Sequence, residues 1–344
     1  MRASSRAGLT LVVLAALTAA AAPLLAPHPT DVRFNRLLNA PPTFFHLQDD
    51  QGAWHAPFIY PWRVVSQLEQ TYQQDRSTRV PLAWFRDGRL VVSSDDARAP
   101  LLWLGADSFG RDVFSRLVFG GRVSLGLAIA AALGALLIGG ALGGVAGYAG
   151  GTLDDVLMRS ADFIMVLPAM YVALALRAVL PLVLPAHVVF VLLASIFAIV
   201  GAPFIARGVR AIVKSERRLD YAAAAQSLGA SAWRVLARHL LPAARGFIVV
   251  EITMLIPAFI IAEATLSFVG LGFPEPTASW GTMLHDASDV RVFVDFPWLL
   301  SPAAAIFLVV LGLNLVFQPA GVGVVYNEPD ETGRRLRTDS HAIY

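Results

Sequence analysis

Residues 220–242 read DYAAAAQSLGASAWRVLARHLLP and lie between two long apolar segments. The run from Ala222 to Ala225 predicts a helix with a smooth surface that a partner could approach closely. Gly229 allows a turn and Ser231 can cap a second helix, which Pro242 is predicted to end. We therefore expect two short helices joined by a glycine turn and presented sideways to a partner.

The second of these helices is predicted to be amphipathic. Apolar residues recur on one face at helical spacing, and two arginines four residues apart lie on another. The apolar face holds Trp233, Leu236, Ala237 and Leu240, and the basic face holds Arg234 and Arg238. The pattern fits a docking element, and by itself it fits equally an ordinary surface hairpin between two membrane spans.

The whole chain is too apolar for an ordinary soluble domain. Of its 344 residues 56% are hydrophobic and 15% charged, and the apolar residues come in blocks about as long as a bilayer is thick. The net charge of +2 is small and gives no reason to expect nucleic-acid binding. The absence of cysteine excludes disulfides, thiolate metal sites and cysteine nucleophiles. The composition predicts a polytopic membrane protein.

Six apolar segments are predicted to cross the membrane, which gives an all-α fold class. They span residues 8–27, 122–147, 158–180, 186–206, 246–271 and 298–318. The first could instead be a cleaved signal peptide, because its alanine-rich end offers small-residue cleavage sites. Its length favours an uncleaved anchor.

Basic residues predict the orientation of the chain. The loop 207–245 carries eight basic residues against two acids, so it is expected in the cytoplasm. Counting crossings from this loop places both termini in the cytoplasm and residues 28–121 and 272–297 outside. The tail 319–344 is expected to be disordered.

The outer segment 28–121 is predicted to form a small α+β insert. A strand-like run covers residues 89–93 and a helix-like run covers residues 62–74. His46 and His55 lie nine residues apart and could be imagined as metal ligands. No third ligand follows at a recognisable spacing, so structural roles are favoured for both.

Residues 104–125, LGADSFGRDVFSRLVFGGRVSL, precede and open the second span. Gly105 and Gly110 allow turns. Four charged residues can form a local ion network that orients the helix entering the membrane, namely Asp107, Arg111, Asp112 and Arg116. The alternative is an interfacial helix whose charges face water.

Residues 263–284, EATLSFVGLGFPEPTASWGTML, close the fifth span. Gly270 and Gly272 are predicted to end it, and Trp280 suits a membrane interface. Glu263 lies in an apolar run, where a bare carboxylate costs about 2.5 to 3.5 kcal/mol. It should therefore face protein or a wet cavity, and a structural hydrogen-bonding role is favoured over contact with substrate.

A few other residues within the predicted spans are informative. Arg177 is close enough to a span end to snorkel, and Asn314 could hydrogen-bond across helices. Pro168 and Pro203 could bend or begin spans. The glycine cluster at 139–151 permits close helix packing.

Three segments together resemble the permease subunits of ABC importers of the dipeptide and oligopeptide family. Residues 104–125 are similar to the signature GTDxxGRDxxSR…GxRxSL, with Ala106 at the position of the family's Thr. Residues 263–284 are similar to EAxLSFLGLGxxPPxxSWGxM. Residues 220–242 resemble the cytoplasmic EAA loop, with Ala223 at the position of the family's Glu.

The residues that carry the resemblance form two groups. The ATPase-coupling loop that it implies contains Ala223, Ala224, Ala225, Gly229, Trp233, Arg234, Arg238, His239, Leu241 and Pro242. The signature segments contain Gly105, Asp107, Gly110, Arg111, Asp112, Ser115, Arg116, Arg122, Glu263, Ser267, Gly270, Gly272, Pro276, Ser279, Trp280, Gly281 and Asn314. The resemblance covers about residues 104–318.

The resemblance implies a domain organisation. A type I ABC importer permease core occupies residues 122–318, with a cytoplasmic coupling loop at 207–245. An N-terminal transmembrane anchor, residues 1–27, and the extracytoplasmic insert, residues 28–121, precede the core, and the tail 319–344 follows it.

The resemblance also implies partners and a function. The chain would form half of a peptide pathway in the bacterial inner membrane, with membrane lipid around it and no nucleic acid. Its partners would be a second homologous permease subunit, two cytoplasmic ABC ATPase subunits and an extracytoplasmic solute-binding protein. No cofactor is expected in this chain, because ATP and Mg would be bound by the ATPase subunits.

Other functions receive less support from the residues. The only lysine, Lys214, lies outside any GxxxxGK[ST] phosphate loop, and no GxSxG or HExxH motif is present, so a non-catalytic subunit is expected. An ion-coupled secondary transporter acting alone should show coupling carboxylates and an internal repeat, whereas Glu263 is the single candidate acid. A membrane anchor whose insert does the binding is a third alternative. Dipeptides, oligopeptides, nickel complexes and peptide-like antibiotics all stay open as substrates.

Overall fold

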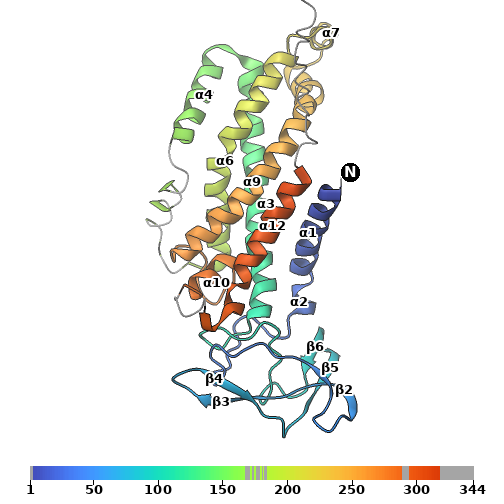
Figure 1. Cartoon of the computed structure of the whole chain (residues 1–344). Coiled ribbons are helices and arrows are strands. Elements are labelled where there is room, and N and C mark those ends of the chain that lie inside the picture. The colour runs from blue at the N-terminus through green and yellow to red at the C-terminus, as the bar shows by residue number, and fades with distance from the viewer. Residues whose placement is uncertain are drawn as a thin grey trace, which may run out of the picture.

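The computed structural model describes residues 3–166, 171–172, 174–175, 179, 181, 184–288 and 294–317. These residues form a bundle of long helices with a small β domain at one end (Figure 1). Within them, four helical segments are long and apolar enough to cross a membrane, namely Val113–Ala149, Ala186–Glu216, Ala232–Phe268 and Pro297–Val316. A shorter apolar helix covers Ser4–Ala20.

The helices follow the predicted order of spans. They are α1 (Ala3–Ala20), α2 (Ala22–Leu25), α3 (Val113–Ala149), α4 (Gly151–Val166), α6 (Ala186–Glu216), α7 (Asp220–Ser227), α8 (Ala232–Val235), α9 (Arg245–Phe268), α10 (Trp280–Asp286) and α12 (Ser301–Phe317). Three short helical turns accompany them. They are the π-turn η1 (Leu236–Leu240) and the 3₁₀-turns η2 (Leu241–Ala244) and η3 (Pro297–Leu300).

Five of the six predicted spans coincide with apolar helices. The predicted third span, 158–180, overlaps α4 only as far as Val166, and most of its remainder lies outside the described residues, as do Arg177 and Pro168. Pro203 lies inside α6, which continues on both sides of it.

Pro242 does not end a helix, and this prediction was wrong. The chain runs from Ala232 to Phe268 as one helical segment, because α8 passes through the π-turn η1 and the 3₁₀-turn η2 directly into α9. Pro242 occupies the first turn of η2, where its missing N–H is easily tolerated. The second helix of 220–242 therefore continues without a break into a membrane span.

Glycines bring α3 and α6 into close contact. A β-carbon at Gly147 would lie 2.7 Å from the Arg210 carbonyl oxygen, and β-carbons at Gly139 and Gly143 would overlap the backbone of α6 at Ala202 and Ala206. The close packing predicted for the cluster 139–151 is confirmed. Small residues allow such backbone approach in membranes, where lipid provides no hydrophobic driving force between helices.

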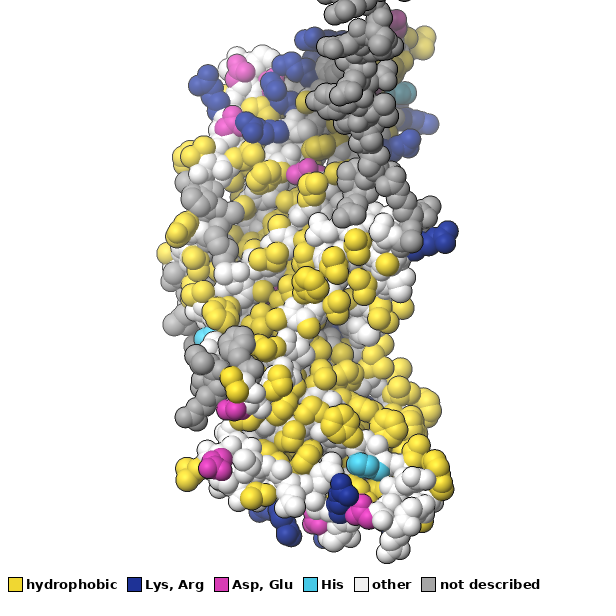
Figure 2. Space-filling model, in the orientation of Figure 1, with side chains coloured by type: hydrophobic (Ala, Val, Ile, Leu, Met, Phe, Trp, Pro, Cys, Tyr) yellow, Lys and Arg dark blue, Asp and Glu magenta, His cyan; other side chains and the backbone are white. Residues whose placement is uncertain are grey.

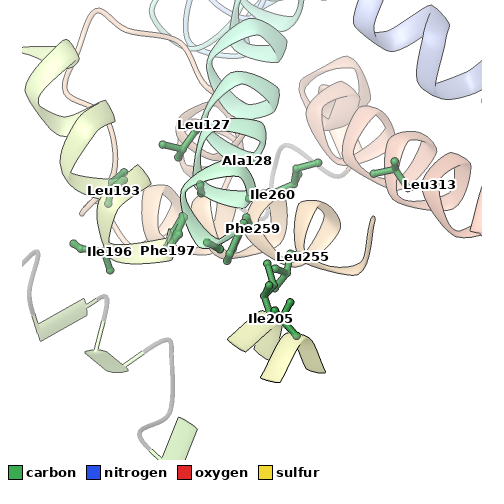
Figure 3. Close-up of a cluster of buried hydrophobic side chains, with 14 of the residues drawn as sticks. Leu127, Ala128, Leu193, Ile196, Phe197, Ile205, Leu255, Phe259, Ile260 and Leu313 are labelled. Carbon is green, nitrogen blue, oxygen red and sulfur yellow. The ribbon is translucent and has the colours of Figure 1, made fainter. Parts of the chain in front are cut away.

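The core of the bundle lies between α3, α6 and α9 (Figure 3). Leu127, Leu193 and Ile260 are fully buried there. The rings of Phe197 and Phe259 stack with centroids 5.6 Å apart and an interplanar angle of 7°, an arrangement that locks α6 against α9.

The β domain contains two small antiparallel sheets. One has the order β1-β2-β5-β6 and the other is the hairpin β3-β4. The strands are β1 (His46–Gln48), β2 (Trp54–Ile59), β3 (Trp62–Ser66), β4 (Thr71–Gln74), β5 (Val80–Arg86) and β6 (Arg89–Ser93).

Of the two elements predicted for the insert, one is confirmed and one is wrong. The strand expected at 89–93 is confirmed as β6, but the helix expected over 62–74 is wrong. That run forms the hairpin β3-β4, in which Val64 pairs with Tyr72. The burial of β3 alternates from residue to residue, which is the period of a half-buried strand and not that of a helix.

The two histidines considered as metal ligands have structural partners. His46 packs beside the rings of Phe58 and Tyr60. His55 lies 2.8 Å from the carboxylate of Asp49. Among the residues that the structure describes, no group of three His, Cys, Asp or Glu side chains could hold a metal ion.

Charged side chains collect at the two ends of the molecule, with a wide apolar band between them (Figure 2). Exposed Leu, Ile, Val and Phe side chains from α1, α3, α9 and α12 contribute to this band. The arrangement is that of a multi-pass membrane protein, whose apolar flank faces lipid.

The glycine contact between α3 and α6 gives a first prediction. We expect Gly143→Ala to destabilise the protein by about 1 to 3 kcal/mol, because the added carbon overlaps the backbone at Ala206. Gly140→Ala is the matched control, since the nearest atom to its β-carbon lies 4.0 Å away. Thermal unfolding in detergent measures both, and equal melting temperatures would contradict the proposed tight contact.

Candidate functional site

The element formed by α7 and α8 lies at the end of the bundle opposite the β domain (Figure 1). Gly229 has a φ of +82°, a backbone conformation that glycine adopts without strain. The Ser231 hydroxyl accepts a hydrogen bond from the Arg234 N–H and caps α8. The predicted glycine turn and the predicted cap are both confirmed.

The outer surface of this element is apolar and uncovered. Leu228 is 88% exposed and Trp233 is 72% exposed. Ala223 and Ala224 are exposed and Ala225 is half-buried. Large apolar side chains at this level of exposure are typical of a surface that another protein covers.

Positive charge surrounds the apolar surface. Arg234, Arg238 and His239 are exposed on the helical segment that follows the turn. Pro242 is also exposed, whereas Leu241 is half-buried and packs toward Gly144 of α3. The surface therefore offers an acidic partner both apolar contact and charge complementarity.

The inner face of the element is anchored in the bundle. Ala222, Val235 and Leu240 are buried and belong to the same core as α3, α6 and α9. The Arg217 guanidinium lies over the Tyr148 ring at 4.8 Å. A displacement of α7 and α8 would therefore act directly on the membrane helices.

An ion cluster that the sequence analysis missed joins α4 to α6 near this end. Asp154 is buried and accepts two hydrogen bonds from Arg210, while Lys214 Nζ lies 3.1 Å from the same carboxylate. Arg207 and Asp162 pair at 2.8 Å. The spacing of these residues in the sequence carries no signal, because the two helices are separated by a long segment.

A second ion cluster is centred on Arg111 at the β-domain end. The Arg111 guanidinium donates to the carboxylate of Asp107 at 2.7 Å. It also donates to Glu275 at 2.5 Å and to Asp286 at 2.7 Å. Arg116 lies 3.5 Å from Asp286 and 3.6 Å from Glu275. The cluster ties the loop before α3 to the segment after α9 and to α10.

This cluster corrects the predicted local network. Glu275 and Asp286, which come from a distant part of the chain, supply two of its three carboxylates and were not predicted. The alternative of an interfacial helix with charges facing water is wrong for Arg111 and Arg116, because each is only 1% exposed. Asp112 belongs to a different set of contacts.

Asp112 caps α3 and holds the chain that follows α2. Its carboxylate accepts from the Phe114 N–H at 3.1 Å and from the Ser115 hydroxyl at 2.5 Å, and lies 3.2 Å from His28 Nδ1. Burial alone would lower the pKa of His28, but the carboxylates of Asp112 and Asp96 outweigh it and raise this pKa to about 9. His28 is therefore a cation at neutral pH and pairs with the cap.

Glu263 lies in a fully buried hydrogen-bonded group at the outer end of α9. It is 0% exposed and accepts from the Ser124 hydroxyl at 2.8 Å and from the Ser267 hydroxyl at 2.7 Å. The Trp280 N–H donates to Ser124 at 3.1 Å, and its indole donates to the Leu117 carbonyl. These contacts confirm the hydrogen-bonding role predicted for Glu263.

The neighbouring signature residues shape the turn after α9. Gly270, with a φ of +84°, follows the end of α9. Ser279 caps α10 with a reciprocal capping box, and Pro276 lies between these two turns. A β-carbon at Gly281 would lie 2.7 Å from a Cα atom of α9, and one at Gly272 would overlap the same helix. This packing explains why small residues occur here.

The remaining signature residues are distributed over several surroundings. Gly105 and Gly110 each have a φ of +73°, as the predicted turns require. Arg122 is exposed on α3. The Asn314 side chain donates to the Val310 carbonyl of its own helix, so the cross-helix bond predicted for it is wrong. Asn314 is exposed, and among the residues that the structure describes its amide bonds only within its own helix.

Comparison with known proteins identifies relatives for most of the bundle. A family profile described as "Binding-protein-dependent transport system inner membrane component" matches residues 139–319. The chain is 39% identical over 227 residues to the oligopeptide transport system permease protein OppC of Bacillus subtilis (strain 168), an alignment that covers 66% of this chain and 72% of that protein.

Two further relatives show a similar level of identity. The glutathione transport system permease protein GsiD of Pectobacterium atrosepticum is 40% identical over 214 residues, covering 62% of this chain and 69% of that protein. The dipeptide transport system permease protein DppC of Alkalihalophilus pseudofirmus is 38% identical over 216 residues, covering 62% of this chain and 68% of that protein.

The Arg111 cluster gives the second prediction. Arg111→Met should destabilise the protein by about 3 kcal/mol, because it removes the nearer of two cations from the buried carboxylates of Asp107 and Asp286. Arg98→Met is the matched control, since that arginine is 73% exposed and pairs only with Asp95 at 3.9 Å; its loss should cost less than about 1 kcal/mol. Thermal unfolding of both variants measures the difference, and similar costs would rule out a structural role for the cluster.

Proposed function

The chain belongs to the family of binding-protein-dependent transport system inner membrane components, and we propose that it is a permease subunit of an ATP-driven ABC importer for peptides. The observation that carries this proposal is an exposed apolar element, α7 and α8, that continues without interruption into a membrane helix. The names of the relatives, which are oligopeptide, dipeptide and glutathione permeases, support peptides as the substrate class.

The proposed partners are a second homologous permease, two cytoplasmic ABC ATPases and an extracytoplasmic solute-binding protein. The chain itself performs no catalysis, and ATP with Mg would be bound by the ATPase subunits. One of the two ATPases would cover Leu228, Trp233 and the exposed alanines of this chain. Closure of the ATPases would then move α7 and α8, and with them α6 and α9, so that the central pathway changes the side to which it opens.

We propose that the chain crosses the bacterial inner membrane six times. Both termini and the α7–α8 element lie in the cytoplasm, and the β domain lies outside. The excess of basic residues in 207–245 supports this orientation. We divide the chain into the anchor 1–27, the insert 28–121, the core 122–318 and the tail 319–344, although the last residues of the insert already lie in α3.

The ion-coupled alternative is not favoured. The relatives are permease proteins of binding-protein-dependent systems. Glu263, the coupling acid considered from the sequence, is fully buried and accepts hydrogen bonds from two serines. A coupling carboxylate must exchange its ion with an aqueous path.

The glycine turn tests the proposed coupling. Gly229→Val places a branched side chain at a positive φ, with strain of about 1 to 2 kcal/mol that should displace α7 from α8. In the reconstituted complex we expect peptide uptake to fall several-fold while ATP hydrolysis continues. Both rates are measured on the same vesicles.

Gly246→Val is the matched control for this experiment. Gly246 lies in α9, its φ is negative, and its β-carbon would meet no atom within 4 Å. Its uptake should stay close to that of the unmodified complex. If Gly229→Val also transports normally, or if the purified chain transports peptide without ATPase subunits, the proposed mechanism fails.

The absence of cysteine allows a direct test of orientation. Leu68→Cys, in the β domain, and Leu228→Cys, in the α7–α8 turn, replace side chains that are 95% and 88% exposed. A membrane-impermeant maleimide should label Leu68→Cys in intact spheroplasts and Leu228→Cys only after lysis. The reverse pattern would place the α7–α8 element outside and exclude its contact with ATPases.

A further inference from the structure

A groove of about 240 Å³ lies between α1, α3 and α12, beside Trp280 of α10. Its walls are formed by Leu11, Leu14, Ala15, Thr18 and Ala19 of α1, by Phe114, Leu117, Val118 and Gly121 of α3, and by Ala305, Leu308 and Val309 of α12. The groove belongs to none of the surfaces assigned to transport above. It opens beside Leu14 and Leu308, which are 58% and 46% exposed on the apolar flank.

Helix packing explains why the groove exists at this level. At one end α1 and α12 touch, since a β-carbon at Gly8 would lie 2.6 Å from the Gly312 carbonyl oxygen. Toward the β domain, the groove lies between the two helices and α3 lines it as well. The gap is therefore closed at the Gly8–Gly312 crossing and open in the half of the bundle next to the β domain.

The groove presents no free polar group. Thr18 is one of two lining side chains that carry a polar atom, and its hydroxyl donates to the Ala15 carbonyl at 2.9 Å. The other is Trp280, whose indole N–H donates to the Leu117 carbonyl at 3.1 Å. Water would have no partners in such a space. A peptide would have to leave its backbone groups unpaired there.

We propose that this groove holds an acyl chain of a membrane phospholipid. The walls are apolar, the opening lies on the exposed apolar flank, and the space lies in the half of the bundle next to the β domain. These properties fit a hydrocarbon chain whose headgroup stays at the membrane surface. The acyl chain fills a gap in which side chains of α1, α3 and α12 would otherwise lose dispersion contacts.

The site has a structural consequence for the signature residues. Trp280 contacts the groove with its ring and donates its backbone N–H to Ser124, which in turn donates to Glu263. A lipid chain against the ring therefore supports the buried Glu263 group from the membrane side. This inference does not depend on the proposed transport function.

Tryptophan quenching tests the proposal on the full-length chain in detergent. Phospholipid with dibrominated acyl chains quenches indole fluorescence on contact, and the part due to Trp280 is the difference from Trp280→Phe. We expect this part to be quenched saturably and to recover when unbrominated phospholipid is added. Ala15→Phe should fill the groove and remove more than half of the quenching due to Trp280.

Ala16→Phe is the matched control, because Ala16 is exposed on the same helix and does not line the groove. Its quenching should equal that of the unmodified chain. If Ala15→Phe does not fold, Ala305→Phe with Ala304→Phe as control repeats the comparison from α12. A brominated free fatty acid added in place of the phospholipid distinguishes the two sources of an acyl chain.

Four results would overturn the proposal. One is no Trp280 quenching in the unmodified chain. Another is quenching that rises without saturation, as expected for loose surrounding lipid. The third is equal quenching in the filled and control variants. The fourth is quenching by the brominated fatty acid without quenching by the brominated phospholipid, which would exclude phospholipid as the occupant.

Discussion

The absence of water inside a bilayer is the constraint on which the rest of this structure depends. Every polar group at membrane depth must find its partner within the protein. The backbone meets this requirement by forming long helices, and Glu263 meets it through the hydroxyls of Ser124 and Ser267. Since lipid cannot drive helices together as water does, association relies on close contact, which the glycines of α3 provide against α6.

The two ends of the bundle are built differently. At the β-domain end, Arg111 and the cap formed by Asp112 with His28 join segments that are distant in the chain. These contacts fix the outer ends of α3, α9 and α10 relative to one another. At the other end, α7 and α8 expose apolar side chains on the outside and bury Ala222, Val235 and Leu240 on the inside. A firm β-domain end and an opposite end that is anchored but exposed fit the proposed transfer of force from a partner.

Local sequence signals predicted the local features well. The turn at Gly229, the cap at Ser231 and the strand at 89–93 all follow from residues that are neighbours in the chain. The errors arose where neighbouring backbone turns or cross-strand pairing outweighed the signal of single residues. Pro242 lies in a helix that continues, because adjacent π and 3₁₀ turns accommodate it. Residues 62–74 form a hairpin since cross-strand pairing with alternate burial outweighs a weak helical pattern.

Composition and apolar block length by themselves determined a multi-pass membrane protein, because these properties depend on transfer between water and lipid residue by residue. Only the tertiary structure decided which charges meet. Glu275 and Asp286 reach Arg111, Asp154 reaches Arg210, and α1 and α12 leave an apolar groove beside Trp280. Such pairings depend on distances between segments far apart in the chain, and no spacing in the sequence encodes them.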